Sequence, residues 1–204
     1  ACSKVGSTQI RNLGTIGGNV VTGSACGDSV SALVALDAIL VLQSSKGKRE
    51  TTIKDFYSPG EKSECDGCYH NTAGVARDEV LVEIYFKKAQ KNEYSAFRKL
   101  GKRKALAKSI LTVGMVIEFD DDKKVKNVRI ALGAVGKHPY RVNSAEKIIE
   151  GNMLTDETIN NCLDEISNIV IANIGNRASC PFKKESVKGV AREVFVSIIE
   201  QSNL

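Results

Sequence analysis

Apolar and polar residues alternate along two long stretches in the second half of the chain. Every second residue is apolar from Leu111 to Phe119, and Val128–Ala134 repeats this pattern after a polar turn at Asp120–Lys124. Because successive side chains of a strand point to opposite faces, each stretch predicts a strand. A further strand is predicted at Tyr94–Leu100, and a three-stranded antiparallel sheet is the simplest arrangement of the three.

After these strands the apolar residues recur at helical spacing. Two stripes of this kind predict two long amphipathic helices. Their apolar positions are Ile159, Cys162, Leu163, Ile166, Ile169 and Val170 in the first, and Val187, Val190, Ala191, Val194, Phe195, Ile198 and Ile199 in the second. A shorter helix is predicted at Ser144–Glu150, ending at Gly151. Helices that cover one face of an antiparallel sheet make an α+β domain, which is the predicted fold class.

The first half of the chain opens with a glycine-rich segment that reaches Gly27. This segment lacks a regular apolar pattern and therefore predicts an ordered loop. From Asp28 onward apolar residues return at helical spacing. We therefore expect a helix at Ser29–Asp37, with Asp28 as its N-cap.

A hairpin follows this helix. Ile39–Gln43 and Glu50–Ile53 predict its two strands and Gly47 its turn. The polar stretch Ser58–Asp78 predicts an irregular excursion, and Val80–Phe86 predicts a further strand.

The polar residues Lys87–Glu93 separate strongly patterned strands on either side. They make the best domain boundary, which we place near Lys91. The prediction is therefore a first domain over residues 1–90 and a second over residues 91–204.

The amino-acid composition is typical of a soluble globular protein. With 42% hydrophobic and 26% charged residues, and no apolar run near the roughly 20 residues that span a bilayer, the 204-residue chain is expected to be soluble. No secretory signal precedes the first elements, so the expected location is cytoplasmic and the six cysteines are expected to be reduced. The net charge of +5 is spread along the chain, and no nucleic-acid-binding motif accompanies it.

The run Gln9–Asn19 combines consecutive glycines with hydroxyl and amide side chains. Glycines let backbone N–H groups turn toward a ligand, which is one way proteins bind phosphates. The run matches neither the Walker pattern nor the dinucleotide fingerprint. From glycine content alone, a tight structural turn is as good an interpretation.

The complete sequence of this segment separates a cofactor site from a structural turn better than its glycine content does. Gln9–Asn19, followed by Gly27-Asp28 and Ala35–Ala38, resembles the FAD-binding subunits of the xanthine dehydrogenase and carbon monoxide dehydrogenase family of molybdenum hydroxylases. The resemblance implies the second lobe of a vanillyl-alcohol-oxidase (PCMH)-type FAD-binding domain, followed by a C-terminal α+β domain of CO dehydrogenase flavoprotein type. It also implies that the N-terminal FAD lobe of the family is absent from this chain.

By this resemblance, the glycine segment lies along the FAD diphosphate; its residues are Thr15, Ile16, Gly17, Gly18 and Asn19. Asp28 is expected on the ribose and adenosine side, with the helix N-cap as its alternative role. Leu81 is expected near the flavin, with plain core packing as the alternative. Arg98 falls where a relative has a lysine facing the cofactor, and a solvated strand cation is the alternative. Val5 matches a further apolar contact, for which core packing is the favoured interpretation.

The resemblance implies an electron-transfer function. Electrons would leave a substrate, a purine or other N-heterocycle, at a molybdopterin centre on a partner subunit. They would pass through iron–sulfur clusters of another partner to FAD on this chain, and then to NAD or another acceptor. The chain is expected to be an oxidoreductase subunit that is inactive alone, without a catalytic side chain of its own. The alternative is a non-enzymatic assembly module, with FAD held mainly by the missing N-terminal lobe.

Three other features carry weaker hypotheses. Cys65 and Cys68 form a CxxC followed by His70, which suggests metal or iron–sulfur ligation, although surface thiols are the simpler interpretation. The basic group from Arg98 to Lys104 suits FAD, a pyridine nucleotide or an acidic partner, or else a solvated edge. His138 is interpreted as a loop residue.

Overall fold

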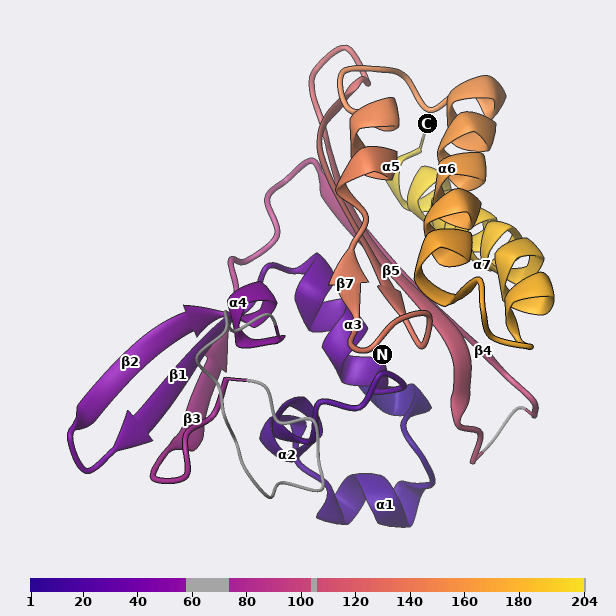
Figure 1. The fold of residues 1–204 in the computed structure, drawn as a ribbon. Coiled ribbons are helices and arrows are strands. Elements are labelled where there is room, and N and C mark those ends of the chain that lie inside the picture. Colours follow the sequence, from indigo (N-terminus) through magenta and orange to yellow (C-terminus); the bar gives the residue numbers. More distant parts are fainter. Residues whose placement is uncertain (58–73, 104–105, 204) are drawn as a thin grey trace.

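The computed structural model describes residues 1–57, 74–103 and 106–203 (Figure 1). The first part of the chain forms a short 3₁₀ turn, helices and a small sheet. Its elements are η1 (Cys2–Lys4), α1 (Thr8–Leu13), α2 (Ile16–Thr22), α3 (Asp28–Ala35), β1 (Ile39–Ser44), β2 (Gly47–Thr52), α4 (Ile53–Tyr57) and β3 (Val80–Tyr85). The second part forms a larger sheet and three helices, which are β4 (Glu93–Gly101), β5 (Ser109–Phe119), β6 (Val125–Gly133), β7 (Tyr140–Arg141), α5 (Asn143–Ile149), α6 (Asp156–Ile174) and α7 (Cys180–Ser202).

Both sheets are antiparallel within the described residues. The first has the order β2-β1-β3. Its hairpin turn lies at Ser45 and Lys46, directly before the predicted Gly47, which begins β2 opposite Ser44 with a φ of +135° that favours glycine. The second has the order β4-β5-β6-β7, with Met115 of β5 opposite Ile130 of β6. The three predicted strands of this sheet are confirmed, and the two-residue β7 extends it at the β6 edge.

The glycine-rich opening is not a loop, and that prediction is wrong. It folds into α1 and α2 because a hydroxyl caps each helix. Ser7 Oγ accepts a hydrogen bond from the Ile10 amide at 3.2 Å, and Thr15 Oγ1 accepts one from the Gly18 amide at 2.9 Å. A cap of this kind contributes about 1 kcal/mol, which offsets the low helix propensity of a glycine.

The larger sheet is covered on both faces. Alternate residues of β5 from Leu111 to Phe119 are buried in one core with α6 and α7, on the face that the sequence analysis assigned to helices. The opposite face packs against α3, with Val116 buried in a second core. The expectation of helices on one face is thus incomplete, because α3 from the first part of the chain covers the other.

Helix α3 approaches the sheet closely because glycines lie beneath it. A side chain at Gly114 would place its Cβ 3.1 Å from the Ser31 carbonyl oxygen and 3.5 Å from the Ala35 Cβ. A side chain at Gly133 would meet Thr112 and Ser31. The small residues on both surfaces therefore determine how near the helix can lie.

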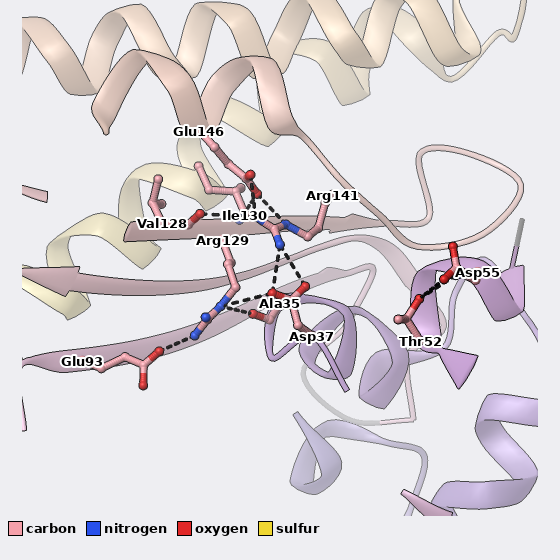
Figure 2. A network of polar contacts seen from close by, with 10 residues as sticks. All are labelled: Ala35, Asp37, Thr52, Asp55, Glu93, Val128, Arg129, Ile130, Arg141 and Glu146. Atoms are coloured by element: carbon pink, nitrogen blue, oxygen red, sulfur yellow. Dashed lines mark hydrogen bonds and ion pairs between the residues drawn. The ribbon is translucent and has the colours of Figure 1, made fainter. Parts of the chain in front are cut away.

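Two arginines fasten the C-terminal end of α3 to the sheet (Figure 2). Arg141 of β7 donates to both carboxylate oxygens of Asp37, at 2.8 and 2.9 Å, and to Glu146 of α5. Arg129 of β6 donates to the Ala35 carbonyl oxygen at 3.0 Å and forms an ion pair with Glu93. The two halves of the chain are therefore joined by charged groups as well as by apolar packing.

The close approach of α3 leads to a stability prediction. Gly114→Val should lower the free energy of unfolding in urea by about 1 to 3 kcal/mol, because the added side chain forces α3 away from β5. As a control, Gly189→Ala on α7, where an added Cβ meets nothing within 4 Å, should raise it by about 0.5 to 1 kcal/mol. An unchanged midpoint for Gly114→Val would show that α3 is not in tight contact with the sheet.

Candidate functional site

The predicted cofactor segment forms the start of α2. Thr15 is its N-cap, Thr22 Oγ1 donates to the Gly18 carbonyl oxygen at 2.7 Å, and the Asn19 amide donates to the Thr15 carbonyl oxygen at 3.1 Å. The first backbone N–H groups of a helix have no partner within it. No described residue accepts a hydrogen bond from the N–H groups of Ile16 and Gly17, so two donors remain for a ligand.

A cleft of about 510 Å³ opens beside this segment. Its lining residues are Cys2, Ser3, Val5, Ile10, Arg11, Gly14, Thr15, Ile16, Gly18, Asn19, Thr22 and Ser29. Among these, Arg11 alone carries a charge, and its guanidinium donates to the Val5 and Gly6 carbonyl oxygens, at 2.8 and 3.3 Å. Beside the apolar side chains of Val5, Ile10 and Ile16, this wall carries hydroxyls, one amide and one cation. Its polar part has no carboxylate and suits an anionic group.

Gly17 and Gly18 face different surroundings. A Cβ on Gly18 would stand 2.9 Å from Thr15 Oγ1, the atom that caps the helix. A Cβ on Gly17 would lie 3.8 Å from Leu81 Cδ2, an ordinary contact. Gly18 therefore borders the cleft, whereas Gly17 packs against β3, and the structure brings Leu81 to the cofactor segment as part of the adjoining core.

Asp28 is not the N-cap of α3, and that alternative is wrong. Gly27 occupies the cap position, and no side chain caps this helix. The Asp28 carboxylate instead turns toward the sheet, where Oδ2 accepts from Lys99 Nζ at 2.5 Å and Oδ1 accepts from Ser109 Oγ. It is 5% exposed, and it lines a smaller cleft that also contains Asn19 and Lys99. A carboxylate buried this deeply needs such partners.

Asn19 links the cofactor segment to α3. Its Oδ1 accepts from Ser29 Oγ at 2.7 Å, and Gly27 leaves room for it, since a Cβ there would lie 3.1 Å from the same oxygen. The position of α2 is thus tied to the start of α3.

The side chain of Arg98 points away from this site. Its guanidinium donates to Ser197 Oγ at 2.5 Å and lies 3.6 Å from Glu193, both on α7. Adjacent residues of a strand face opposite sides, so Lys99 points to the cofactor side instead. Lys99 belongs to the basic group that the sequence predicted but was not singled out in it, although strand alternation around Arg98 indicates it. Ser109 was not predicted.

Four of the five residues of the predicted basic group line a cavity, and the fifth, Lys104, lies outside the described residues. A cleft of about 780 Å³ runs along the end of β4, and its charged lining residues are Lys4, Arg11, Arg98, Lys99, Lys102 and Arg103. It shares Gly6 and Arg11 with the neighbouring clefts, so the cationic surface continues toward the cofactor segment.

Cys65, Cys68 and His70 lie outside the described residues, so the hypothesis of a metal or iron–sulfur site there stays a prediction. In the described part of the chain, no three His, Cys, Asp or Glu side chains lie close enough to bind a metal ion. Nor does this part contain a helix whose length and apolar content would let it cross a membrane.

Two protein-family models match the chain. The FAD binding domain in molybdopterin dehydrogenase matches residues 1–86, and the CO dehydrogenase flavoprotein C-terminal domain matches residues 95–198. The chain belongs to this family of FAD-binding flavoprotein subunits. The predicted family and fold class are thereby confirmed.

Curated relatives share this family. The chain is 39% identical over 98% of its length to the nicotinate dehydrogenase FAD-subunit of Eubacterium barkeri, and covers 66% of that protein. It is 30% identical over 91% of its length to the xanthine dehydrogenase FAD-binding subunit of Escherichia coli O157:H7, and covers 59% of that protein. The chain thus spans less than two thirds of the length of these relatives.

Solved structures share the fold. The carbon monoxide dehydrogenase from Hydrogenophaga pseudoflava that lacks the Mo-pyranopterin moiety superimposes with a TM-score of 0.82 at 22% identity, over 96% of this chain and 64% of that one. Quinoline 2-oxidoreductase from Pseudomonas putida 86 gives a TM-score of 0.79 at 19% identity, over 98% of this chain and 65% of that one.

The family's cofactor is FAD, and the described residues fit part of it. Two backbone donors that find no acceptor among the described residues, at Ile16 and Gly17, and a cleft wall free of carboxylates suit the FAD diphosphate. Asp28, in the lining of the adjoining cleft, keeps lone pairs beyond those used by Lys99 and Ser109 and suits ribose hydroxyls.

The buried ion pair beneath the site should contribute to stability. Lys99→Met should lower the free energy of unfolding by about 3 to 5 kcal/mol, because it leaves the buried Asp28 carboxylate without its cation. Adding Asp28→Asn should recover much of that loss. Lys188→Met, which breaks an exposed pair with Asp164, should cost less than about 1 kcal/mol. Equal effects of the two lysine substitutions in urea unfolding would contradict this account.

Proposed function

We propose that this chain carries FAD as the electron-transfer subunit of a molybdenum hydroxylase. Electrons released from a substrate at a partner's molybdopterin pass through a partner's iron–sulfur clusters to the FAD, and from there to NAD or another acceptor. The observation that carries the proposal is the cleft lined by Thr15, Ile16 and Gly18 at the start of α2, where the N–H groups of Ile16 and Gly17 find no acceptor among the described residues. These residues lie within the match to the FAD-binding family model.

When bound, FAD supplies the redox chemistry through its isoalloxazine ring. The residues of this chain bind and orient it. Thr15, Ile16, Gly17, Gly18 and Asn19 hold the diphosphate, and Asp28 holds the ribose. Val5 provides an apolar wall, and Leu81 supports the segment by packing against Gly17. Lys99 takes the role that the sequence predicted for Arg98.

The substrate class and partners come from relatives. The nicotinate, xanthine and quinoline enzymes are all named for nitrogen heterocycles, so we propose a substrate of this class for the complex. Iron–sulfur and molybdopterin subunits are the proposed partners, and the cytoplasm is the proposed location. We retain the domain break near Lys91, and we propose that the chain has no activity without its partners.

A second candidate function is that of an assembly module, in which polypeptide outside this chain holds most of the FAD. Three large apolar side chains beside the cleft favour it. Leu13 is 89% exposed, Ile10 53% and Ile16 50%. Apolar side chains gathered in this way often mark a surface that another protein segment covers.

The two functions differ in the behaviour of the purified chain. If the chain binds FAD by itself, it should emerge yellow from gel filtration after incubation with FAD, and Gly18→Ala should raise the FAD dissociation constant about tenfold by displacing Thr15 from its capping position. Gly17→Ala, whose methyl group fits against Leu81, should change it less than about threefold.

A colourless chain that retains FAD only with its partner polypeptides would favour the assembly module. Equal effects of the two alanine substitutions would contradict the placement of the diphosphate beside Gly18.

A further inference from the structure

Two side chains hold the C-terminal end of α2. Tyr57, at the end of α4, donates its hydroxyl to the Val20 carbonyl oxygen at 2.7 Å. His138, in the connection between β6 and β7, lies with Nδ1 3.0 Å from the Gly23 carbonyl oxygen. Because a carbonyl oxygen only accepts, Nδ1 carries the proton in this bond. Both bonds reach carbonyls at the helix end, which cannot all be satisfied within the helix.

The Tyr57 and His138 rings are in contact with each other. Tyr57 and His138 are stacked, with ring centroids 5.0 Å apart and an interplanar angle of 19°. They are 7% and 9% exposed, respectively. Burial raises the pKa of Tyr57 well above its usual value, so the hydroxyl keeps the proton that it donates. Burial also lowers the pKa of His138, which favours the neutral ring.

Helix α2 depends on contacts of this kind. It has seven residues, and Val20 is the one residue of it that is buried. Isolated helices shorter than about 12 residues are marginal in water, so propensity alone does not hold it. Its middle residue, Asn19, is bonded to Ser29 of α3. Its C-terminal end is held by Tyr57 and His138, which belong to different halves of the molecule.

We propose that Tyr57 and His138 are positioning residues for the cofactor segment, and that they set the direction of α2 by fixing its C-terminal end. The helix is about 10 Å long, so movement at Gly23 is carried to the N–H groups of Ile16 and Gly17 at the other end. This inference rests on the proposed function for its consequence, which is FAD affinity. The mechanical part, the fastening of α2, can be tested without FAD.

The first test is amide hydrogen exchange in the full chain without flavin. Tyr57→Phe and His138→Phe each keep a ring and remove one donor. Together they should speed exchange of the Asn19–Gly23 amides about tenfold, while α7 amides keep their rates. Tyr85→Phe is the matched control, because it removes a hydroxyl of β3 that donates to Glu50 of β2. It should leave the exchange rates of the α2 amides unchanged.

The second test is the FAD dissociation constant, measured at a temperature where all variants are folded. Each of the two phenylalanine variants should bind FAD about three- to tenfold more weakly than the wild type. His138→Asn, which places an amide donor near the position of Nδ1, should restore most of the affinity. A general loss of stability would not be rescued in this selective way.

The outcomes separate the two proposals. Unchanged α2 exchange in the double variant overturns the positioning role, whatever the flavin result. Faster exchange with no FAD binding by the wild-type chain upholds the fastening of α2 and contradicts independent FAD binding. Faster exchange with unchanged FAD affinity overturns the link from the helix end to the cofactor.

Discussion

Helix α3 is held at both ends by a carboxylate that pairs with a cation of the larger sheet. Asp28 at its start binds Lys99 of β4, and Asp37 just beyond its end binds Arg141 of β7. Between these pairs, the helix lies directly on Gly114 and Gly133. Ion pairs alone add little net stability, but buried charges without partners cost several kcal/mol. The buried Asp28–Lys99 pair therefore fixes where the start of α3 lies, whereas the more exposed Asp37–Arg141 pair adds a weaker constraint at its end. Close packing supplies the attraction.

The position of the cofactor segment depends on this helix. Asn19 bonds to Ser29 in the first turn of α3, and Asp28 forms part of the adjoining cleft. The proposed diphosphate donors and the proposed ribose acceptor thus belong to neighbouring elements anchored on one sheet. A binding site needs this fixed geometry, because each hydrogen bond to an anion is strong only at a defined distance and angle.

The sequence predicted the elements well where one period dominates, as in the alternation along β5 and the stripes of α6 and α7. It failed at α1 and α2, because caps at Ser7 and Thr15 outweigh glycine content there. It did not predict α3 on the second face of the sheet, which depends on a tertiary fit between small residues and glycines. The cofactor segment was predicted from its string of residues, and its contact with FAD stays a prediction. The pairing of Asp28 with Lys99 and Ser109 was not predicted, since it joins α3 to strands distant in sequence.

We expect FAD to bind with its diphosphate against the first turn of α2. Amide-resolved NMR of the isotope-labelled chain during an FAD titration tests this placement. The Ile16 and Gly17 amide resonances should shift together and saturate with FAD, because their N–H groups take the diphosphate as acceptor. Absence of binding, or saturating binding that shifts amides elsewhere and leaves Ile16 and Gly17 unmoved, would contradict it.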